Sequence, residues 1–205
     1  MGQARIFELI AGHPALDLVN TLDWRFRDVG PEELLESYGD LLYFAEQSGL
    51  LDTKQARRLR READETKAGR VLSATRELRE AAAEIFYAEL DGRNPGAASI
   101  TKLEAQFKAA RARQKLVAND SGLRWDWVEE QSSPELTLWQ LALSVEELLT
   151  SEKLGMVRAC AKPDCRWLFL DTSKNHTRRW CDMKICGNRM KARRFKAHRR
   201  VELSA

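Results

Sequence analysis

Four cysteines supply the clearest chemistry in this chain of 205 residues. Cys160 pairs with Cys165 and Cys181 with Cys186, each pair with four intervening residues, and fifteen residues separate the two pairs. Two such pairs joined by a loop are typical of structural zinc ribbons, in which four thiolates surround one Zn²⁺ as a tetrahedron. Because four thiolates leave no open position on the metal, the spacing argues against a hydrolytic zinc. The expected cofactor is a structural Zn²⁺ with these four ligands.

Three other interpretations of the cysteines can be compared with a zinc site. The first twenty residues carry acidic side chains inside their apolar stretch and do not resemble a secretion signal, so two disulfides are not expected. An iron–sulfur cluster also takes four cysteines, but the symmetric spacing favours zinc. Unrelated buried cysteines would not be expected in two equally spaced pairs. His176, in the loop between the pairs, could replace a ligand, but with four cysteines present it is expected at the surface or beside a phosphate.

Charge is divided unevenly along the chain. The net charge is only +3, yet residues 158–205 hold 14 basic and 4 acidic side chains, which leaves 20 basic and 27 acidic side chains for the remainder. An acidic body with a basic, cysteine-bearing tail indicates a polyanionic partner. Attraction to phosphates that weakens with added salt is the expected physical consequence.

The basic residues are spaced for display on a helix that follows the last cysteine. Gly187 is expected to take a positive φ in the turn, and Asn188 to cap a helix over residues 189–201. Few acids interleave with these residues, which favours nucleic-acid contact over a solvated tail. DNA is the preferred partner, although an RNA-binding helix would look much the same. The residues expected to contact nucleic acid are Arg178, Arg179, Arg189, Lys191, Arg193, Arg194, Lys196 and Arg200.

Residues 1–153 are expected to form a mainly helical body. Apolar residues recur at helical spacing in several segments, while alternating apolar residues on both sides of Asn119–Gly122 indicate a β-hairpin. The fold class is therefore mainly α (α+β): a helical N-terminal domain with a small β-hairpin, followed at 154–205 by a treble-clef or zinc-ribbon-like module that ends in the basic helix. Helices are expected over 16–22, 40–47, from 53, 70–91, 100–110 and 133–151, and strands before Gly12 and over 115–118, 123–128 and 166–170.

Several function classes are excluded or disfavoured. No stretch approaches the roughly eighteen uninterrupted apolar residues of a membrane span, and the chain is expected in the cytoplasm. It contains no glycine-rich phosphate loop and neither HExxH nor GxSxG, and no clustered nucleophile or acid–base set can be named, so an enzyme is not expected. The oligomeric state is not predicted.

Three polar residues follow the turn at Gly12 and Pro14. Asp17, Asn20 and Thr21 lie at helix-compatible spacing within an apolar segment. They are candidates for lining a pocket for a small molecule, and capping or surface roles are the alternative. We expect all three to face a cavity or internal contacts rather than open solvent.

The residues also resemble a known family. Both cysteine pairs, Trp180 before Cys181, and the run Cys186-Gly187-Asn188-Arg189 ahead of a Lys/Arg-rich stretch resemble the bacterial CGNR zinc-finger proteins, over about residues 156–200. The segment from Gly12 through Leu-Asp-Leu-Val-Asn-Thr resembles the associated ABATE domain, over most of residues 5–150, with Leu18 where an aromatic residue is common.

This resemblance implies a transcription regulator with a sensing body and a finger that binds nucleic acid, for which DNA is the preferred partner. Two alternatives stay open. One is an RNA-binding protein that uses the same finger. The other is a small-molecule-binding or enzymatic body for which the finger is only an interaction module. A pocket that holds Asp17 and Asn20 beside aromatic walls would favour the second alternative, and a tightly filled core there would weaken it.

Overall fold

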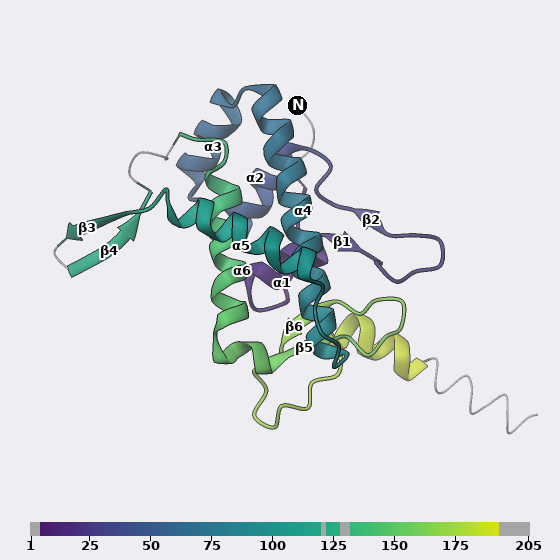
Figure 1. The fold of residues 1–205 in the computed structure, drawn as a ribbon. Coiled ribbons are helices and arrows are strands. Elements are labelled where there is room, and N and C mark those ends of the chain that lie inside the picture. The colour runs from purple at the N-terminus through teal and green to yellow at the C-terminus, as the bar shows by residue number, and fades with distance from the viewer. Residues whose placement is uncertain (1–4, 120–121, 128–131, 193–205) are drawn as a thin grey trace, which may run out of the picture.

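The computed structural model describes residues 5–119, 122–127 and 132–192. Helices make up most of this part, and the strands within it form three two-stranded antiparallel sheets, which confirms the predicted fold class (Figure 1). The α-helices are α1 (Pro14–Asn20), α2 (Tyr38–Gln47), α3 (Thr53–Glu62), α4 (Glu65–Leu90), α5 (Ala97–Arg111) and α6 (Leu136–Thr150). The strand pairs are β1 (Leu22–Asp23) with β2 (Glu32–Glu33), β3 (Lys115–Asn119) with β4 (Gly122–Asp126), and β5 (Val157–Ala159) with β6 (Leu168–Leu170).

Short polar side chains set where the helices of the body begin. Asp52 accepts a hydrogen bond from the backbone N–H of Gln55 at 2.7 Å, and the side chain of Gln55 accepts one in return from the backbone of Asp52. Ser37 and Asp40 form the same reciprocal cap on α2. Such a box satisfies backbone donors that a helix start leaves without partners. The helix expected from residue 53 therefore begins at Thr53.

The helix α1 is the buried centre of the body. Residues 15–20 are all buried, and α1 packs against α4, α6 and β6. The helix ends at Asn20, two residues earlier than expected, because the Thr21 hydroxyl donates to the carbonyl of Leu18 at 2.6 Å and Leu22 pairs with Glu33 in the β1–β2 sheet. The apolar body is thus built around a helix that itself carries polar side chains.

The segment that precedes α1 does not form the expected edge strand, and residues 5–13 contain no strand. Side chains bind its backbone instead. The N–H of Phe7 donates to Gln47 at 2.9 Å, and the N–H of Ala11 donates to Asp17 at 3.0 Å. Because these donors are already satisfied, the segment needs no neighbouring strand.

The predicted β3–β4 hairpin is confirmed. Leu116 lies opposite Trp125, and Ala118 opposite Leu123. The hairpin projects from the helical body (Figure 1), and Leu116, Leu123 and Trp125 are exposed.

The cysteine-bearing segment is joined to the body by a shared core. The short 3-10 helix η1 (Glu152–Met156) leads from α6 into the β5–β6 hairpin. Val157, Leu168 and Leu170 are buried in the same apolar cluster as α1, α4 and α6. The N–H of Leu170 also donates to the carbonyl of Ala11 at 2.8 Å. Among the described helices, none has both the length and the apolar character that a membrane crossing needs.

Candidate metal centre and nucleic-acid interface

The four cysteines meet at one point. Their Sγ atoms all lie within 4.8 Å of one another, and all four residues are buried. Cys181 Sγ lies 3.8 Å from that of Cys165 and 3.6 Å from that of Cys186. Zn–S bonds of about 2.3 Å in a tetrahedron place the sulfurs about 3.8 Å apart, whereas a disulfide would bring them to about 2.0 Å. No cysteine is in a disulfide, so the donor set fits Zn²⁺.

Tight turns position the two pairs. The N–H of Cys160 donates to the carbonyl of Trp167 at 2.8 Å, which extends the β5–β6 hairpin up to the first ligand. The N–H of Cys165 donates to the carbonyl of Lys162 at 3.0 Å. In the second pair, the N–H of Cys186 donates to the carbonyl of Asp182 at 3.0 Å. The two turns bring all four sulfurs within 4.8 Å of one another.

The thiols perturb one another strongly. Hydrogen bonds from the Cys165 and Cys181 thiols lower the pKa of Cys160, and the same bonds raise the pKa of the two donors. Burial raises the pKa of Cys186. Four thiolates this close together would repel one another. A bound Zn²⁺ would favour the deprotonated form of all four cysteines.

The helix after the second pair begins earlier than the sequence indicates. The side chain of Asp182 accepts from the N–H of Ile185 at 2.7 Å and caps a π-helical turn, η2 (Met183–Gly187), that continues as helix to residue 192. Asn188 already has helical φ and ψ of −66° and −40°, so its prediction as the N-cap is wrong. The physical reason is that Cys186 must lie in the first turn of the helix to reach the other sulfurs.

Gly187 has a role different from the predicted one. Its φ is not positive. The residue is buried, and an added Cβ would lie 2.4 Å from the Met183 sulfur and 3.2 Å from Cδ1 of Trp180. The missing side chain therefore allows the first turn of the helix to pack closely against Trp180.

Asn20 ties the body to the cysteine-bearing segment. Its side-chain Nδ2 donates to the carbonyl of Leu168 at 2.9 Å, and its Oδ1 accepts from the N–H of Leu168 at 2.9 Å. The amide thus pairs with β6 as the backbone of a neighbouring strand would. Both partners are buried, so this contact replaces water with a matched donor and acceptor.

Asp17 and Thr21 also have partners within the protein. Asp17 accepts from Ala11, and burial raises the pKa of its carboxyl to about 6 although backbone N–H groups oppose the shift. Thr21 accepts a hydrogen bond from Arg79 at 3.2 Å. The prediction that these residues and Asn20 face internal contacts is confirmed, since all three are buried. The cavity beside them measures about 10 Å³, the space of one water molecule, and their role toward a ligand stays a prediction.

Comparison with known families accounts for both halves of the chain. The sequence model of the ABATE family, described as "Putative stress-induced transcription regulator", matches residues 12–152. The chain belongs to the ABATE family. The model of the CGNR zinc finger matches residues 156–199, which include the four clustered cysteines. Among curated proteins, no sequence matches the chain.

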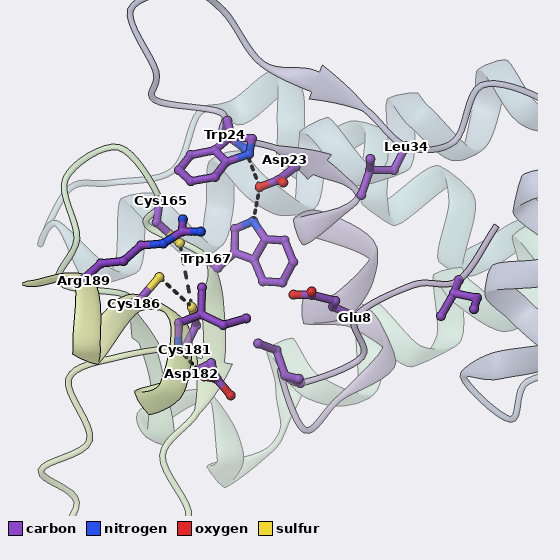
Figure 2. A pocket seen from close by; sticks show the side chains of 13 residues that line it. Glu8, Asp23, Trp24, Leu34, Cys165, Trp167, Cys181, Asp182, Cys186 and Arg189 are labelled. Atoms are coloured by element: carbon purple, nitrogen blue, oxygen red, sulfur yellow. Dashed lines mark hydrogen bonds between the residues drawn. The ribbon is translucent and has the colours of Figure 1, made fainter.

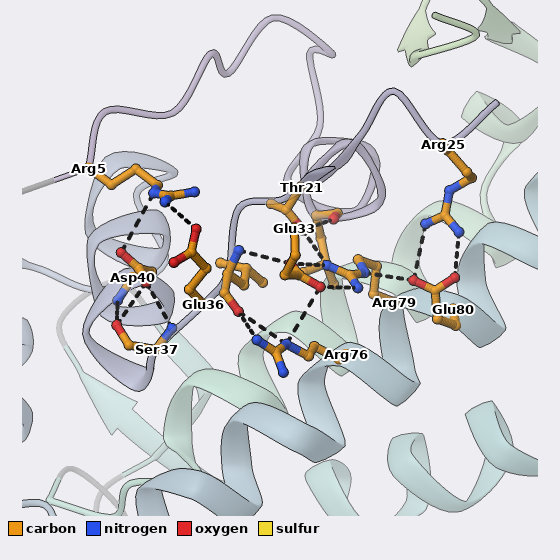
Figure 3. Close-up of polar contacts among 12 residues, drawn as sticks. Arg5, Thr21, Arg25, Glu33, Glu36, Ser37, Asp40, Arg76, Arg79 and Glu80 are labelled. Carbon is orange, nitrogen blue, oxygen red and sulfur yellow. Dashed lines mark hydrogen bonds and ion pairs between the residues drawn. The ribbon is translucent and has the colours of Figure 1, made fainter. Parts of the chain in front are cut away.

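The ABATE segment also contains an ion-pair network that the sequence analysis missed (Figure 3). Arg79 on α4 is 3% exposed and donates two hydrogen bonds of 2.7 Å to the carboxylate of Glu33 on β2. Burial opposes the ionisation of Glu33, but the hydrogen bonds and charge of Arg79 lower its pKa below the ordinary value. Glu80 binds both Arg79 and Arg25. The network joins α4 to β2, Thr21 and Arg25, and the only sequence signal for it was a charged residue on the apolar face of α4.

The basic residues of the CGNR finger fall into two groups. Arg178 belongs to the scaffold, because its guanidinium donates to the carbonyls of Trp180 and Cys181 and lies 4.3 Å from the centre of the Phe169 ring. Arg179, Arg189 and Lys191 are exposed. The other predicted nucleic-acid contacts lie outside the described residues: Arg193, Arg194, Lys196 and Arg200.

Two further exposed cations of the finger were not among the predicted contacts. Lys174 and Lys184 lie in the same basic segment, and a count of its charges, rather than of one helix face, would have found them. The acids nearby are engaged elsewhere. Asp164 pairs with Lys162 at 2.5 Å, Asp171 accepts from Ser173 at 2.5 Å, and Asp182 caps the helix. A cavity of about 350 Å³ in the same segment is lined by Thr177, Arg178, Arg179, Trp180 and Met183.

Proposed function

We propose that this protein regulates transcription by binding DNA through its CGNR finger, with Zn²⁺ held by Cys160, Cys165, Cys181 and Cys186. We assign residues 1–153 to the body and 154–205 to the finger. The observation that carries the proposal is the cysteine cluster at the start of a helix whose exposed cations lack acidic partners among the described residues.

The metal has a structural role in this proposal. When bound, Zn²⁺ supplies a covalent-like link between two turns and no chemistry of its own, because its four positions are filled by sulfur. The apolar cluster around the cysteines is small, with Phe169 at its centre and Ile10, Trp167 and Trp180 packed against it. A module with so little buried apolar surface depends on metal ligation for much of its folding free energy.

The exposed cations then act on phosphates. The short stretch of helix anchored by the cysteine cluster carries three exposed cations, Lys184, Arg189 and Lys191. None of them is paired with an acid in the described part of the chain. Cations displayed together on a fixed scaffold release counterions when they meet a phosphate backbone, which is the main source of affinity for nucleic acid. The cavity lined by Thr177, Arg179 and Trp180 adds a hydroxyl, a guanidinium and an indole, which suit a phosphate and an adjoining sugar or base.

The ABATE body holds the finger in place and is proposed to sense a small molecule. The body contacts β6 through Asn20 and the shared apolar core. A conformational change in the body would therefore alter the position of the finger. The description of the family supports a regulator rather than an enzyme.

The proposal predicts preferential binding of duplex DNA over a structured RNA of equal length at the same salt concentration. Replacing Lys184 and Lys191 by alanine should weaken DNA binding about tenfold, because two phosphate contacts are lost. The matched control is Lys54→Ala with Arg57→Ala, which removes two exposed cations from α3, at the opposite end of the molecule (Figure 1). Fluorescence anisotropy gives the affinities.

The control variant should bind like the native protein. Tighter binding of the RNA would favour the RNA-binding alternative. Equal loss of affinity in the two variants would mean that attraction is spread over the whole surface and that the finger has no special part in it.

A further inference from the structure

A cavity of about 320 Å³ lies between the ABATE body and the finger (Figure 2). The body contributes Glu8, Asp23 and Trp24, and the finger contributes Trp167, Asp182 and Arg189, next to three of the four cysteines. Its size is at the lower end of the range for small-molecule sites. Asp17, Asn20 and Thr21 do not line it, so it is separate from the site that the sequence predicted.

Negative charge dominates the lining. The lining includes three carboxylates, those of Glu8, Asp23 and Asp182, and one cation, Arg189. Four thiolates around Zn²⁺ would add two net negative charges at the wall formed by the cysteines. Two further cations lie over the ring of Trp24: Arg27 at 3.9 Å and Lys162 at 4.5 Å. Lys162 is already paired with Asp164. The effect of the Arg27 charge on Asp23 is opposed by the negative charge of Glu32.

Two of the carboxylates are held in place by hydrogen bonds, and all three keep unused acceptor positions. Oδ1 of Asp23 accepts from the backbone N–H of Trp24 at 2.6 Å and from Nε1 of Trp167 at 2.7 Å, as Figure 2 shows. Oδ1 of Asp182 accepts from Ile185. Among the described residues, no group donates a hydrogen bond to the second oxygen of either carboxylate or to the side chain of Glu8. A cationic donor would satisfy them.

Apolar side chains complete the walls. Ile6 is 88% exposed and Ile185 is 38% exposed at the edge of this cavity, and Ile10, Leu34 and the two indoles lie with them. An occupant with an apolar body would cover these side chains, and removing apolar surface from water favours binding. The lining therefore calls for a molecule with one charged end and one apolar end.

We propose that this cavity binds a small organic cation, an ammonium or guanidinium group carried on an apolar body. A single arginine against three carboxylates disfavours an anion. A metal ion does not fit, because the cysteines form the only cluster of potential ligands close enough for one in the part of the chain that the structure describes. The inference locates the small-molecule sensing that belongs to the proposed function, and Arg189 links the cavity to the proposed nucleic-acid surface.

Three probes of nearly equal size and different charge test the proposal: 2-phenylethylammonium, 2-phenylethanol and phenylacetate. Each is titrated by calorimetry into the zinc-loaded full-length protein without nucleic acid, so that the outcome does not depend on DNA binding. The cation should bind most tightly, the neutral alcohol more weakly, and the anion not at all. Glu8→Gln should weaken binding of the cation about fivefold, the effect of one partly exposed charge pair, and leave the alcohol unchanged.

The matched control is Glu104→Gln, which removes an exposed carboxylate from α5, away from the cavity. It should leave all three affinities unchanged. Equal affinities for the three probes, tightest binding of phenylacetate, no heat of binding for the cation, or an unchanged affinity in Glu8→Gln would each overturn the proposal. If the native protein does not bind duplex DNA in the experiment above but still binds the cation here, only the proposed function is refuted.

Discussion

Single polar side chains hold the two halves of this protein together. An asparagine amide carries a donor and an acceptor side by side, and Asn20 uses both on Leu168. An aspartate in its place could not donate to the carbonyl, and an apolar residue would leave both backbone groups of a buried strand unsatisfied. This explains why a polar residue stands on the buried helix α1.

Asp17 should make the stability of the protein depend on pH. Burial raises its pKa from 3.8 to about 6, so the folded state binds the proton more tightly than the unfolded state does. Stability from this group is therefore greatest below the unfolded pKa and falls as the pH rises from about 4 to about 6, by about 3 kcal/mol in total. Asp17→Asn cannot ionise and keeps an acceptor for Ala11, so its unfolding free energy should lack this fall.

Urea unfolding between pH 4 and pH 7 measures the effect. Glu89→Gln, which removes an exposed carboxylate from α4, is the control and should follow the native protein. If native protein and Asp17→Asn lose stability in parallel over this range, the carboxyl of Asp17 does not titrate as described.

The sequence predicted which polar residues of α1 are buried, but it could not predict their partners. Polar groups inside an apolar helix must find partners within the protein, and this argument needs no structure. The partners themselves come from far along the chain: Leu168 is 148 residues from Asn20, and Arg79 is 58 residues from Thr21. Contacts at such separation leave no pattern in local sequence.

At the scale of elements, the sequence correctly predicted helix starts and turns that are made by neighbouring residues. The start of α3 at Thr53 and the β3–β4 hairpin follow from such local signals. They failed where a tertiary contact decides. The finger helix begins at Met183 because Cys186 must reach the other sulfurs. The segment before α1 forms no strand because Gln47 and Asp17 bind its backbone.

Removal of the metal should loosen one set of elements and spare another. Cys165→Ser, or chelation of zinc, should expose the amides of residues 172–192 to exchange, because the turns there are joined through the metal. The β5–β6 hairpin should stay protected, since Leu168 and Leu170 are packed into the core of the body. Hydrogen exchange followed by mass spectrometry distinguishes the two segments, and elemental analysis should give one zinc per native chain.

Protein without stoichiometric zinc in its native form would contradict the metal site. Unchanged protection of residues 172–192 after chelation would show that the finger folds without its metal. Loss of protection throughout α1, α4 and α6 would show instead that the body depends on zinc.

The whole molecule combines an acidic body and a basic finger that share an apolar cluster through β5 and β6. The match to the ABATE family ends at residue 152, and the match to the CGNR finger begins at residue 156. Near the same point the sequence changes from an acidic segment without cysteines to a basic segment that holds all four. It did not show that β6 of the finger lies against α1, or that a cavity forms between the two parts, because both depend on how distant segments pack. The finger is thus held by its metal on one side and by the body on the other.

The central claim is that the basic segment after Cys186 binds phosphates, and the salt dependence of DNA affinity tests it most directly. Phosphate contacts by Arg189, Arg193, Lys196 and Arg200 contribute about −3.6 to the log–log slope on duplex DNA, at roughly −0.9 for each contact. Arg193→Ala with Lys196→Ala should flatten the slope by about two and weaken binding to all sequences, while Lys54→Ala with Arg57→Ala should leave it unchanged. An unchanged affinity and slope in the Arg193/Lys196 variant would contradict the claim and would mean that the basic segment is a solvated tail.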